Sequence, residues 1–217
     1  ADFGTAAILT VFVGIAAVMV DAGLSTALIQ RQDVTPTDEA TVFWLNAAVG
    51  LALALAIMFA AGPAAAFFGQ PTLRELFWAA ALTVLVSALG AVHSALLTKR
   101  LDFRTQCKAG LVATAGASTL AVILAFSGFG VWALAAQMVT MATLYTASLW
   151  AFHRWRPVPI FSIAAAKRLL GFGGLVLAAN LIDTLYNRAY AVLIGRYIGI
   201  AELGYYDRAE NTKRVPE

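Results

Sequence analysis

The side chains with the clearest chemical potential are charged and amide groups that lie inside long apolar runs. Arg188, Asp183 and Asn187 fall within the run Phe172–Gly195, which is otherwise mostly apolar. An ionisable group surrounded by hydrocarbon is costly and by default marks a functional position. Asp183 and Asn187 are four residues apart and share a helix face, and the long side chain of Arg188 can reach Asp183. Two interpretations stay open: these groups face a cavity, or Arg188 snorkels toward lipid headgroups and only neutralises Asp183.

Polar groups also occur singly in other apolar runs. Asp21 lies in the first run, where a carboxylate can bind a cation or a proton. It can equally cap a second half-helix that starts near Ser25, by accepting hydrogen bonds from free backbone amides. Asn46, His93 and Gln137 each stand alone in a run, and interhelical hydrogen bonding is the usual explanation for such residues. Asp21 is therefore a candidate cation or proton site, and Asn46 is a candidate binding residue.

The composition indicates which elements hold these groups. Of the 217 residues, 61% are hydrophobic and 12% are charged, whereas a soluble domain has about 25% charged residues. The solvent is therefore lipid, in which a backbone must form helices or a closed barrel. Barrel strands alternate apolar and polar residues over about ten positions, so these long Ala- and Leu-rich runs predict helices. The runs that reach the roughly 20 residues of a span are Phe3–Ile29, Thr41–Gly62, Leu76–Leu97, Cys107–Phe126, Val131–Phe152 and Phe172–Gly195.

The connections between the runs carry turn signals and a few charges. Gly62-Pro63 and the segment Gly69–Pro71 predict the limits of one loop. The acidic stretch Asp33–Glu39 is interpreted as a solvated loop, since an acid–base catalytic loop would need a partner motif. The stretch Ile160–Leu170 has apolar residues beside two basic ones. It is either a short helix at the membrane interface or the first turns of the sixth span.

Basic residues gather on one set of alternating connections, which by the positive-inside rule faces the cytoplasm. The opposite connections carry Arg74 and Arg196. Trp44, Trp150 and Trp155 fall near the same, predicted cytoplasmic, ends, as an aromatic belt requires. The basic residues of this set are Arg31, Lys99, Arg100, Arg104, Lys108, Arg154, Arg156, Lys167 and Arg168.

Several segments, in chain order, resemble a known family. They are Asp21–Arg31 (DAGLSTALIQR), Phe43–Asn46 (FWLN), Arg100–Arg104 (RLDFR), Gly128–Leu134 (GFGVWAL) and Leu203–Ala209 (LGYYDRA). The set is similar to the Wzx-like O-antigen and exopolysaccharide flippases of the multidrug/oligosaccharidyl-lipid/polysaccharide superfamily. A short self-similarity between Ala1–Gly4 and Ala201–Gly204 is also typical of the internal repeats of transporters.

The resemblance implies an all-α integral membrane fold with six or seven transmembrane helices, most of one lobe of a two-lobe transporter plus the start of the second. Residues 1–152 would form the N-terminal lobe without its first helix. Residues 153–171 would form a cytoplasmic linker with an interfacial helix, and residues 172–217 the start of the C-terminal lobe.

The resemblance also implies a substrate. The protein would flip an undecaprenyl-pyrophosphate-linked oligosaccharide across the bacterial inner membrane by alternating access, for O-antigen, capsule or exopolysaccharide synthesis. Arg188 would hold the pyrophosphate, because a guanidinium matches phosphate oxygens bidentately. Asn187, Asp183 and Asn46 would complete the substrate-binding set, and Asp21 would take the coupling ion.

Two alternatives stay open: a multidrug-type cation-coupled exporter, and a membrane-embedded glycosyltransferase or acyltransferase. The sequence has no P-loop, no paired-histidine metal motif and no Ser/His/Asp set at loop positions, so we expect no cofactor, no metal and no enzymatic activity. Membrane topology accounts for the basic connections, so we expect no nucleic-acid partner. The implied partners are the lipid-linked oligosaccharide, membrane lipids, and the polysaccharide polymerase with its chain-length machinery.

Overall fold

Helices make up most of the computed structural model, which describes residues 12–16, 18–20, 24–31, 33–199, 203, 206 and 209. They include α2 (Leu24–Gln30), α3 (Pro36–Phe68), α4 (Thr72–Lys99), α5 (Phe103–Phe126), α6 (Val131–Phe152) and α7 (Ile163–Leu193). A short π-helix, η1 (Ile194–Ile198), continues α7. The described residues contain no strand, which confirms the all-α class predicted from the composition.

Local capping chemistry makes α3 start earlier than its apolar run. α3 begins at Pro36, ahead of the predicted Thr41. The Asp38 amide donates to the Thr35 hydroxyl at 3.3 Å, and the Thr35 amide donates to the Asp38 carboxylate at 3.0 Å. This reciprocal pair is a capping box, and Pro36 fits the first helical position because its missing N–H is not needed there.

The far end of α3 differs from the sequence prediction. Gly62-Pro63 was expected to end the helix, and this is wrong: α3 runs through Pro63 to Phe68. An interior proline removes one backbone hydrogen bond at a cost of about 3 kcal/mol, and the alanines that follow it restore the helix. The helix ends where Gly69 adopts a left-handed conformation with φ of 64° and its amide bonds to the carbonyls of Ala65 and Ala66.

The helices are long and apolar enough for a multi-spanning membrane protein. Among the described residues, α3, α4 and α5 qualify as spans alone, and the number rises to 5 if two bent pairs each count as one span. One pair is Phe12–Val20 with Leu24–Gln30, inclined by 43°, which agrees with the break predicted between them. The other is Ile163–Gly171 with Gly173–Thr184, inclined by 51°. α6, which was predicted as a span, has 22 residues but is not among these spans. Its polar side chains, such as Gln137, lower its mean hydropathy.

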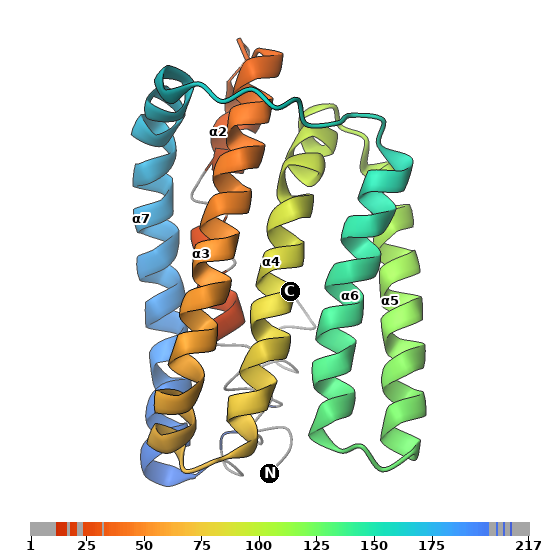
Figure 1. The fold of residues 1–217 in the computed structure, drawn as a ribbon, viewed down its shortest axis with the longest axis vertical. Helices are drawn as coiled ribbons and strands as arrows, with labels where there is room; N and C mark the ends of the chain where they lie inside the picture. The colour runs from red at the N-terminus through yellow and green to blue at the C-terminus, as the bar shows by residue number, and fades with distance from the viewer. Residues whose placement is uncertain are drawn as a thin grey trace.

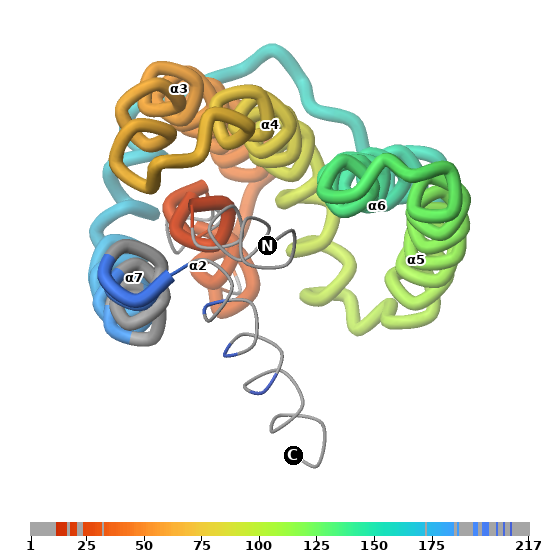
Figure 2. The backbone as a smooth tube through the Cα atoms, turned by 90° about the horizontal axis from the view of Figure 1, so that it is seen from below, coloured from red at the N-terminus to blue at the C-terminus, as the bar shows by residue number. Residues whose placement is uncertain are grey.

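The long helices run up and down, roughly side by side (Figure 1). Seen along the bundle, α7 and α5 lie at the two ends of an arc, with α3, α4 and α6 between them (Figure 2). Alternating direction brings residues 31, 33–35, 100–102 and 153–162 to one end of the bundle, which we call the basic end. Lys99 Nζ donates to the Arg31 carbonyl there at 2.7 Å. The connections predicted to share one side of the membrane therefore do lie together.

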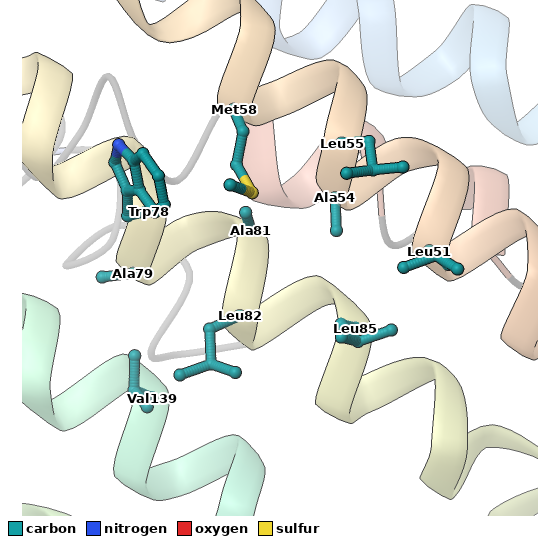
Figure 3. Close-up of a pocket in the computed structure, with 10 residues that line it drawn as sticks. All are labelled: Leu51, Ala54, Leu55, Met58, Trp78, Ala79, Ala81, Leu82, Leu85 and Val139. Carbon is teal, nitrogen blue, oxygen red and sulfur yellow. The ribbon is translucent and has the colours of Figure 1, made fainter.

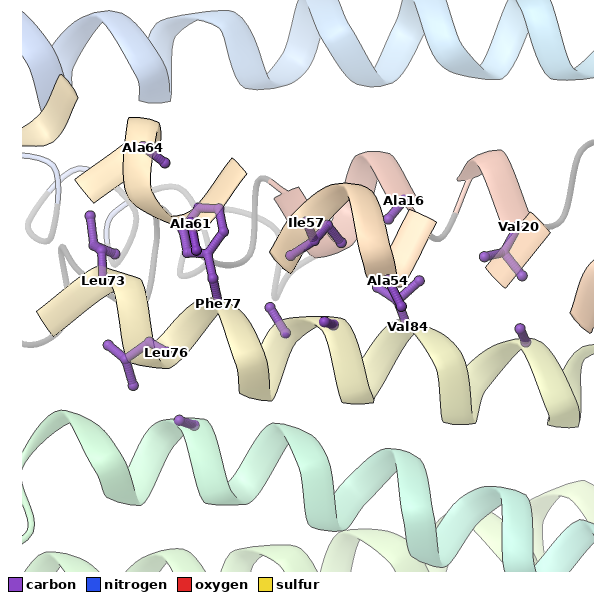
Figure 4. Packing of buried hydrophobic residues seen from close by; sticks show 14 of the residues in the cluster. Ala16, Val20, Ala54, Ile57, Ala61, Ala64, Leu73, Leu76, Phe77 and Val84 are labelled. Carbon is purple, nitrogen blue, oxygen red and sulfur yellow. The ribbon is translucent and has the colours of Figure 1, made fainter. Parts of the chain in front are cut away.

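The main apolar cluster lies between α3, α4 and the helical segment around residues 12–20 (Figure 4). Phe77 of α4 is fully buried. Small residues let the backbones approach, as is usual where lipid supplies no hydrophobic force between helices. A Cβ added at Gly50 of α3 would overlap the Cβ of Ala88 in α4, and one at Gly90 would lie 2.7 Å from the Thr146 hydroxyl of α6.

Replacing Gly50 by alanine should destabilise the bundle by about 1–3 kcal/mol, because the added methyl forces α3 and α4 apart. Gly110→Ala in α5 is the matched control. Apart from the backbone of its own helix, no heavy atom of the described residues lies within 4 Å of a Cβ built at Gly110, and alanine favours a helix by up to about 1 kcal/mol over glycine. Thermal unfolding of both variants in one detergent measures the difference. Equal stability of Gly50→Ala and wild type would show that α3 and α4 accommodate the added methyl without loss of stability.

Candidate functional site

The polar set predicted on the last apolar run lies on α7. Arg188 and Asn187 are helical residues of α7, but their side chains are outside the described part of the structure. Asp183 is exposed on the same helix and has an interaction partner. Asp21 lies outside the described residues. The grouping of these residues into one site therefore stays a prediction.

Asn46 is the candidate whose surroundings are best defined. It is fully buried in α3, and neither atom of its side-chain amide has a hydrogen-bond partner among the described residues. The expected interhelical hydrogen bond is therefore not formed between Asn46 and any described residue. A buried polar group without partners costs about 1–3 kcal/mol and requires an explanation beyond packing. Asn46 accordingly remains a candidate binding residue.

The most extensive polar contacts lie at the basic end. The connection from α6 to α7, residues 153–162, crosses the ends of the other helices (Figure 1), and we call it the strap. Hydrogen bonds fasten it to the first turns of α3. They run from Trp155 Nε1 to Glu39 Oε2 at 2.6 Å, from Trp44 Nε1 to the Val158 carbonyl at 3.0 Å, and from the Ser162 amide to the Thr41 hydroxyl at 3.1 Å. The strap is thus part of the packed structure and not a loose linker.

Asp38 joins α3 to the start of α7. Its side chain is 3% exposed, and its Oδ1 lies 2.6 Å from Nη2 of Arg168, while its other oxygen caps α3. The interpretation of Asp33–Glu39 as a solvated loop is therefore wrong for Asp38 and Glu39, because α3 starts early and turns both carboxylates toward α7 and the strap. Burial of Asp38 strengthens the ion pair, but Arg168 is 50% exposed, so solvent screening reduces its contribution.

Two histidines and two tryptophans meet where the strap leaves α6. The ring of His93 in α4 lies 4.8 Å from that of Trp150, 5.1 Å from that of Trp155 and 5.5 Å from that of His153, between centroids. We call these four residues the histidine–tryptophan cluster. The guanidinium of Arg156 lies 5.6 Å from the Trp150 ring centroid, in the range of a cation–π contact. The cluster therefore ties α4, α6 and the strap together.

Hydrogen bonds, burial and charge shift the pKa values of His153 and of Asp102 close to this cluster. The Thr105 hydroxyl and amide donate to Asp102 at 2.7 and 3.1 Å, and these bonds hold the pKa of Asp102 below its ordinary value. Burial, reinforced by Arg100 and Arg156, lowers the pKa of His153 below 6.5, while Asp102 acts in the opposite sense. At neutral pH the strap therefore begins with an uncharged histidine beside two arginines.

An apolar groove with a volume of about 470 Å³ lies between α3 and α4 (Figure 3). Among the residues that the structure describes no charged side chain lines it, so the groove suits a hydrocarbon chain and cannot orient a polar headgroup. It contains none of the site residues predicted from the sequence. Its lining residues are Leu51, Ala54, Leu55 and Met58 of α3, Trp78, Ala79, Ala81, Leu82 and Leu85 of α4, and Val139 of α6.

The contacts at the basic end were largely missed by sequence reasoning. The tryptophans were recognised only as an aromatic belt, and no short motif signals that Trp155 reaches Glu39, 116 positions away. Arg168 and Asp38 are 130 positions apart. Local signals exist for the Thr35–Asp38 capping box, a threonine three residues before an acidic residue, and for Asp102, an acidic N-cap at the start of α5. In the described part of the chain no group of three or more His, Cys, Asp or Glu is placed to hold a metal ion. The contacts at the basic end therefore attach the strap to the helices and place charged groups beside titratable ones.

Comparison with known proteins gives several relatives. The chain is 29% identical over 215 residues to the succinoglycan biosynthesis transport protein ExoT of Rhizobium meliloti, covering 99% of this chain and 44% of that protein. It is 28% identical over 203 residues to the teichuronic acid biosynthesis protein TuaB of Bacillus subtilis, covering 93% and 42%. It is 26% identical over 221 residues to the lipopolysaccharide biosynthesis protein WzxC of Escherichia coli, covering 99% and 44%. No solved structure matches the chain.

The length of these relatives limits what they say about the whole protein, since the chain spans less than half of each. The family match, in contrast, covers the whole of this chain. Residues 1–217 match the family described as "Polysaccharide biosynthesis protein", and the relatives, whose names refer to three different polymers, align with nearly all of this chain. Together with the all-α, multi-spanning fold, this agreement shows that the chain belongs to the polysaccharide biosynthesis protein family.

Proposed function

We propose that the protein carrying this chain moves lipid-linked oligosaccharides across the bacterial inner membrane for the synthesis of O-antigen, capsule or exopolysaccharide. The observation that carries the proposal is the family match over residues 1–217. It is supported by a relative named as a succinoglycan biosynthesis transport protein and by the apolar helices α3, α4 and α5, which are long enough to span a bilayer. The substrate class is an undecaprenyl pyrophosphate that carries a sugar chain.

Alternating access requires two groups of helices that move against each other. Residues 1–152 are assigned to the N-terminal lobe, 153–171 to the linker and 172–217 to the start of the C-terminal lobe. The 51° inclination between Ile163–Gly171 and Gly173–Thr184 falls at the proposed end of the linker, which supports this division. The strap contacts and the Asp38–Arg168 pair join the N-terminal lobe to the linker at the basic end.

The proposed binding residues come from both lobes. Arg188 holds the pyrophosphate, with Asn187 and Asp183 on the same helix, while Asn46 offers a buried amide to the polar part of the substrate. Asp21 is the proposed site of the coupling ion. The polysaccharide polymerase and its chain-length machinery receive the flipped product.

Replacing Arg188 by alanine in the full-length protein should reduce polysaccharide export at least tenfold. Loss of a charge-assisted contact costs about 1.5–3 kcal/mol, and about 1.4 kcal/mol corresponds to a factor of ten. Export is measured as surface polysaccharide in a strain that lacks its own transporter, with insertion checked in the membrane fraction. Arg74→Ala, at an exposed position near the start of α4, is the matched control and should export normally. Equal export by the two variants would remove Arg188 from the mechanism.

A liposome assay separates transport from enzymatic activity. Purified full-length protein in sealed vesicles should make lipid-linked oligosaccharide from the inner leaflet accessible to an outside reagent that modifies sugars. The same protein in detergent, where no compartments exist, should leave the substrate chemically unchanged. Chemical turnover in detergent would instead support a membrane-embedded transferase, and no movement in vesicles would contradict the proposed function.

Breaking the Asp38–Arg168 pair should weaken the attachment of the linker to the N-terminal lobe. Arg168→Gln should lower the unfolding free energy by about 1 kcal/mol, a value between those of exposed and buried pairs because only Asp38 is buried. Asp38→Ala should cost about 1 kcal/mol more, since it also removes the helix cap. Lys167→Gln, at the exposed neighbouring position, should stay within about 0.5 kcal/mol of wild type. Thermal unfolding of both single variants and the double variant measures the coupling, and strictly additive effects would show that the pair does not interact.

A further inference from the structure

The chain contains 2 histidines, and the fold brings their rings together. His93 comes from α4, and His153 directly follows α6. Their ring centroids are 5.5 Å apart with the planes at 82°. His93 is fully buried, and His153 is 6% exposed. Two titratable rings from separate elements are thus enclosed at the point where the strap begins.

The enclosed rings lack the usual compensation for burial. None of the four ring nitrogens makes a hydrogen bond to a residue that the structure describes. The backbone of Trp155 approaches the His93 ring, but no well-aligned hydrogen bond forms. Buried polar atoms without partners are rare in native structures and call for a role other than packing.

The charged groups that face His153 come from three elements. Arg100 lies at the end of α4, Arg156 lies in the strap, and the carboxylate of Asp102 lies at the start of α5. Arg156 also holds the strap in place. Its Nη1 donates to the carbonyls of His153 and Trp155 at 2.7 Å each, and its Nη2 donates to that of Trp150 at 2.8 Å. A positive charge on His153 would therefore arise beside the guanidinium that fixes the first residues of the strap.

We propose that the His93–His153 pair is a proton-binding site that controls whether the strap stays fastened to α3. A proton from water binds a ring nitrogen of His153 and creates a third cation beside Arg100 and Arg156. The ring turns out to solvent, Arg156 releases its carbonyl partners, and Trp155 separates from Glu39. The importance of this release for transport rests on the proposed function, because only in a carrier does a freed linker change the relative movement of two lobes.

The direction of the pH dependence follows from the surroundings of His153. In the packed strap, burial and the two arginines lower the pKa of His153 below its ordinary 6.5, whereas a ring released into water returns to about 6.5. The released strap therefore takes up the proton more readily than the packed strap does. Stability of the packed form is complete above about pH 6.5 and is lost as the pH falls below it.

A spin label on the strap tests the proposal in full-length protein reconstituted in lipid nanodiscs without substrate. Val158 is exposed and accepts the label after Val158→Cys, with the exposed Cys107 and any other accessible cysteine replaced by serine. We expect an immobile label at pH 7.5 and at least a threefold larger mobile fraction at pH 5.5. A label at Leu111→Cys, exposed on α5, is the matched control and should show no such change.

Substitutions of His153 identify the group that titrates. His153→Gln stays neutral, and its strap label should remain immobile at both pH values. His153→Lys is permanently charged, and its label should be mobile at both. The proposal is overturned if the wild-type label does not respond to pH, or if the response persists in His153→Gln. Failure of this assay leaves the liposome transport result unaffected, and failure of transport leaves the proton site standing.

Discussion

Hydrocarbon offers a backbone no hydrogen-bond partners, and this constraint determines most of the structure. The described spans are helices. Side-chain caps at Thr35 and Asp102 close the starts of α3 and α5, and the left-handed Gly69 closes the end of α3. Lipid is as apolar as the helix surfaces, so burial alone cannot hold the helices together. Small residues such as Gly50 and Gly90 let neighbouring backbones approach closely enough for dispersion to act. Polar contacts gather at the basic end, and within the bundle the Thr146 hydroxyl of α6 also donates to the Val86 carbonyl of α4 at 3.1 Å.

The basic end shows how few residues this arrangement needs to join distant parts of the chain. Asp38 starts α3 through its capping box and also pairs with Arg168 of α7, so one carboxylate links secondary structure to tertiary structure. Glu39 and Thr41, on the next positions of the same helix, bind the strap. α3 therefore packs against the other helices of the N-terminal part and also binds the strap. In the proposed two-lobe carrier this connection would transmit the movement of one lobe to the other.

Local patterns explain which features could be predicted from the sequence. The bounds of α6, the helical class and the alternation of basic connections follow from apolar run length and charge placement, which are properties of adjacent residues. The continuation of α3 through Pro63 depends on whether neighbouring turns can absorb one lost hydrogen bond, which run length does not reveal. Asp38 and Glu39 were misjudged because their partners, Arg168 and Trp155, are more than a hundred positions away. A helix that carries Asp183, Asn187 and Arg188 was predicted, and α7 contains it, although α7 begins at Ile163, ahead of the predicted Phe172. A helical pattern alone does not show what those side chains contact.

The apolar groove between α3 and α4 also affects how the protein behaves outside its membrane. A space of about 470 Å³ lined by alkyl and aromatic groups is wetted by acyl chains in a bilayer, and extraction must exchange those chains for the tails of a surfactant. Tail length and branching then decide how well the groove is filled, because an underfilled space forfeits dispersion contacts along its walls. Measurements on the purified protein therefore depend on the bound surfactant as well as on the protein. Lipid that stays in the groove is part of the folded particle.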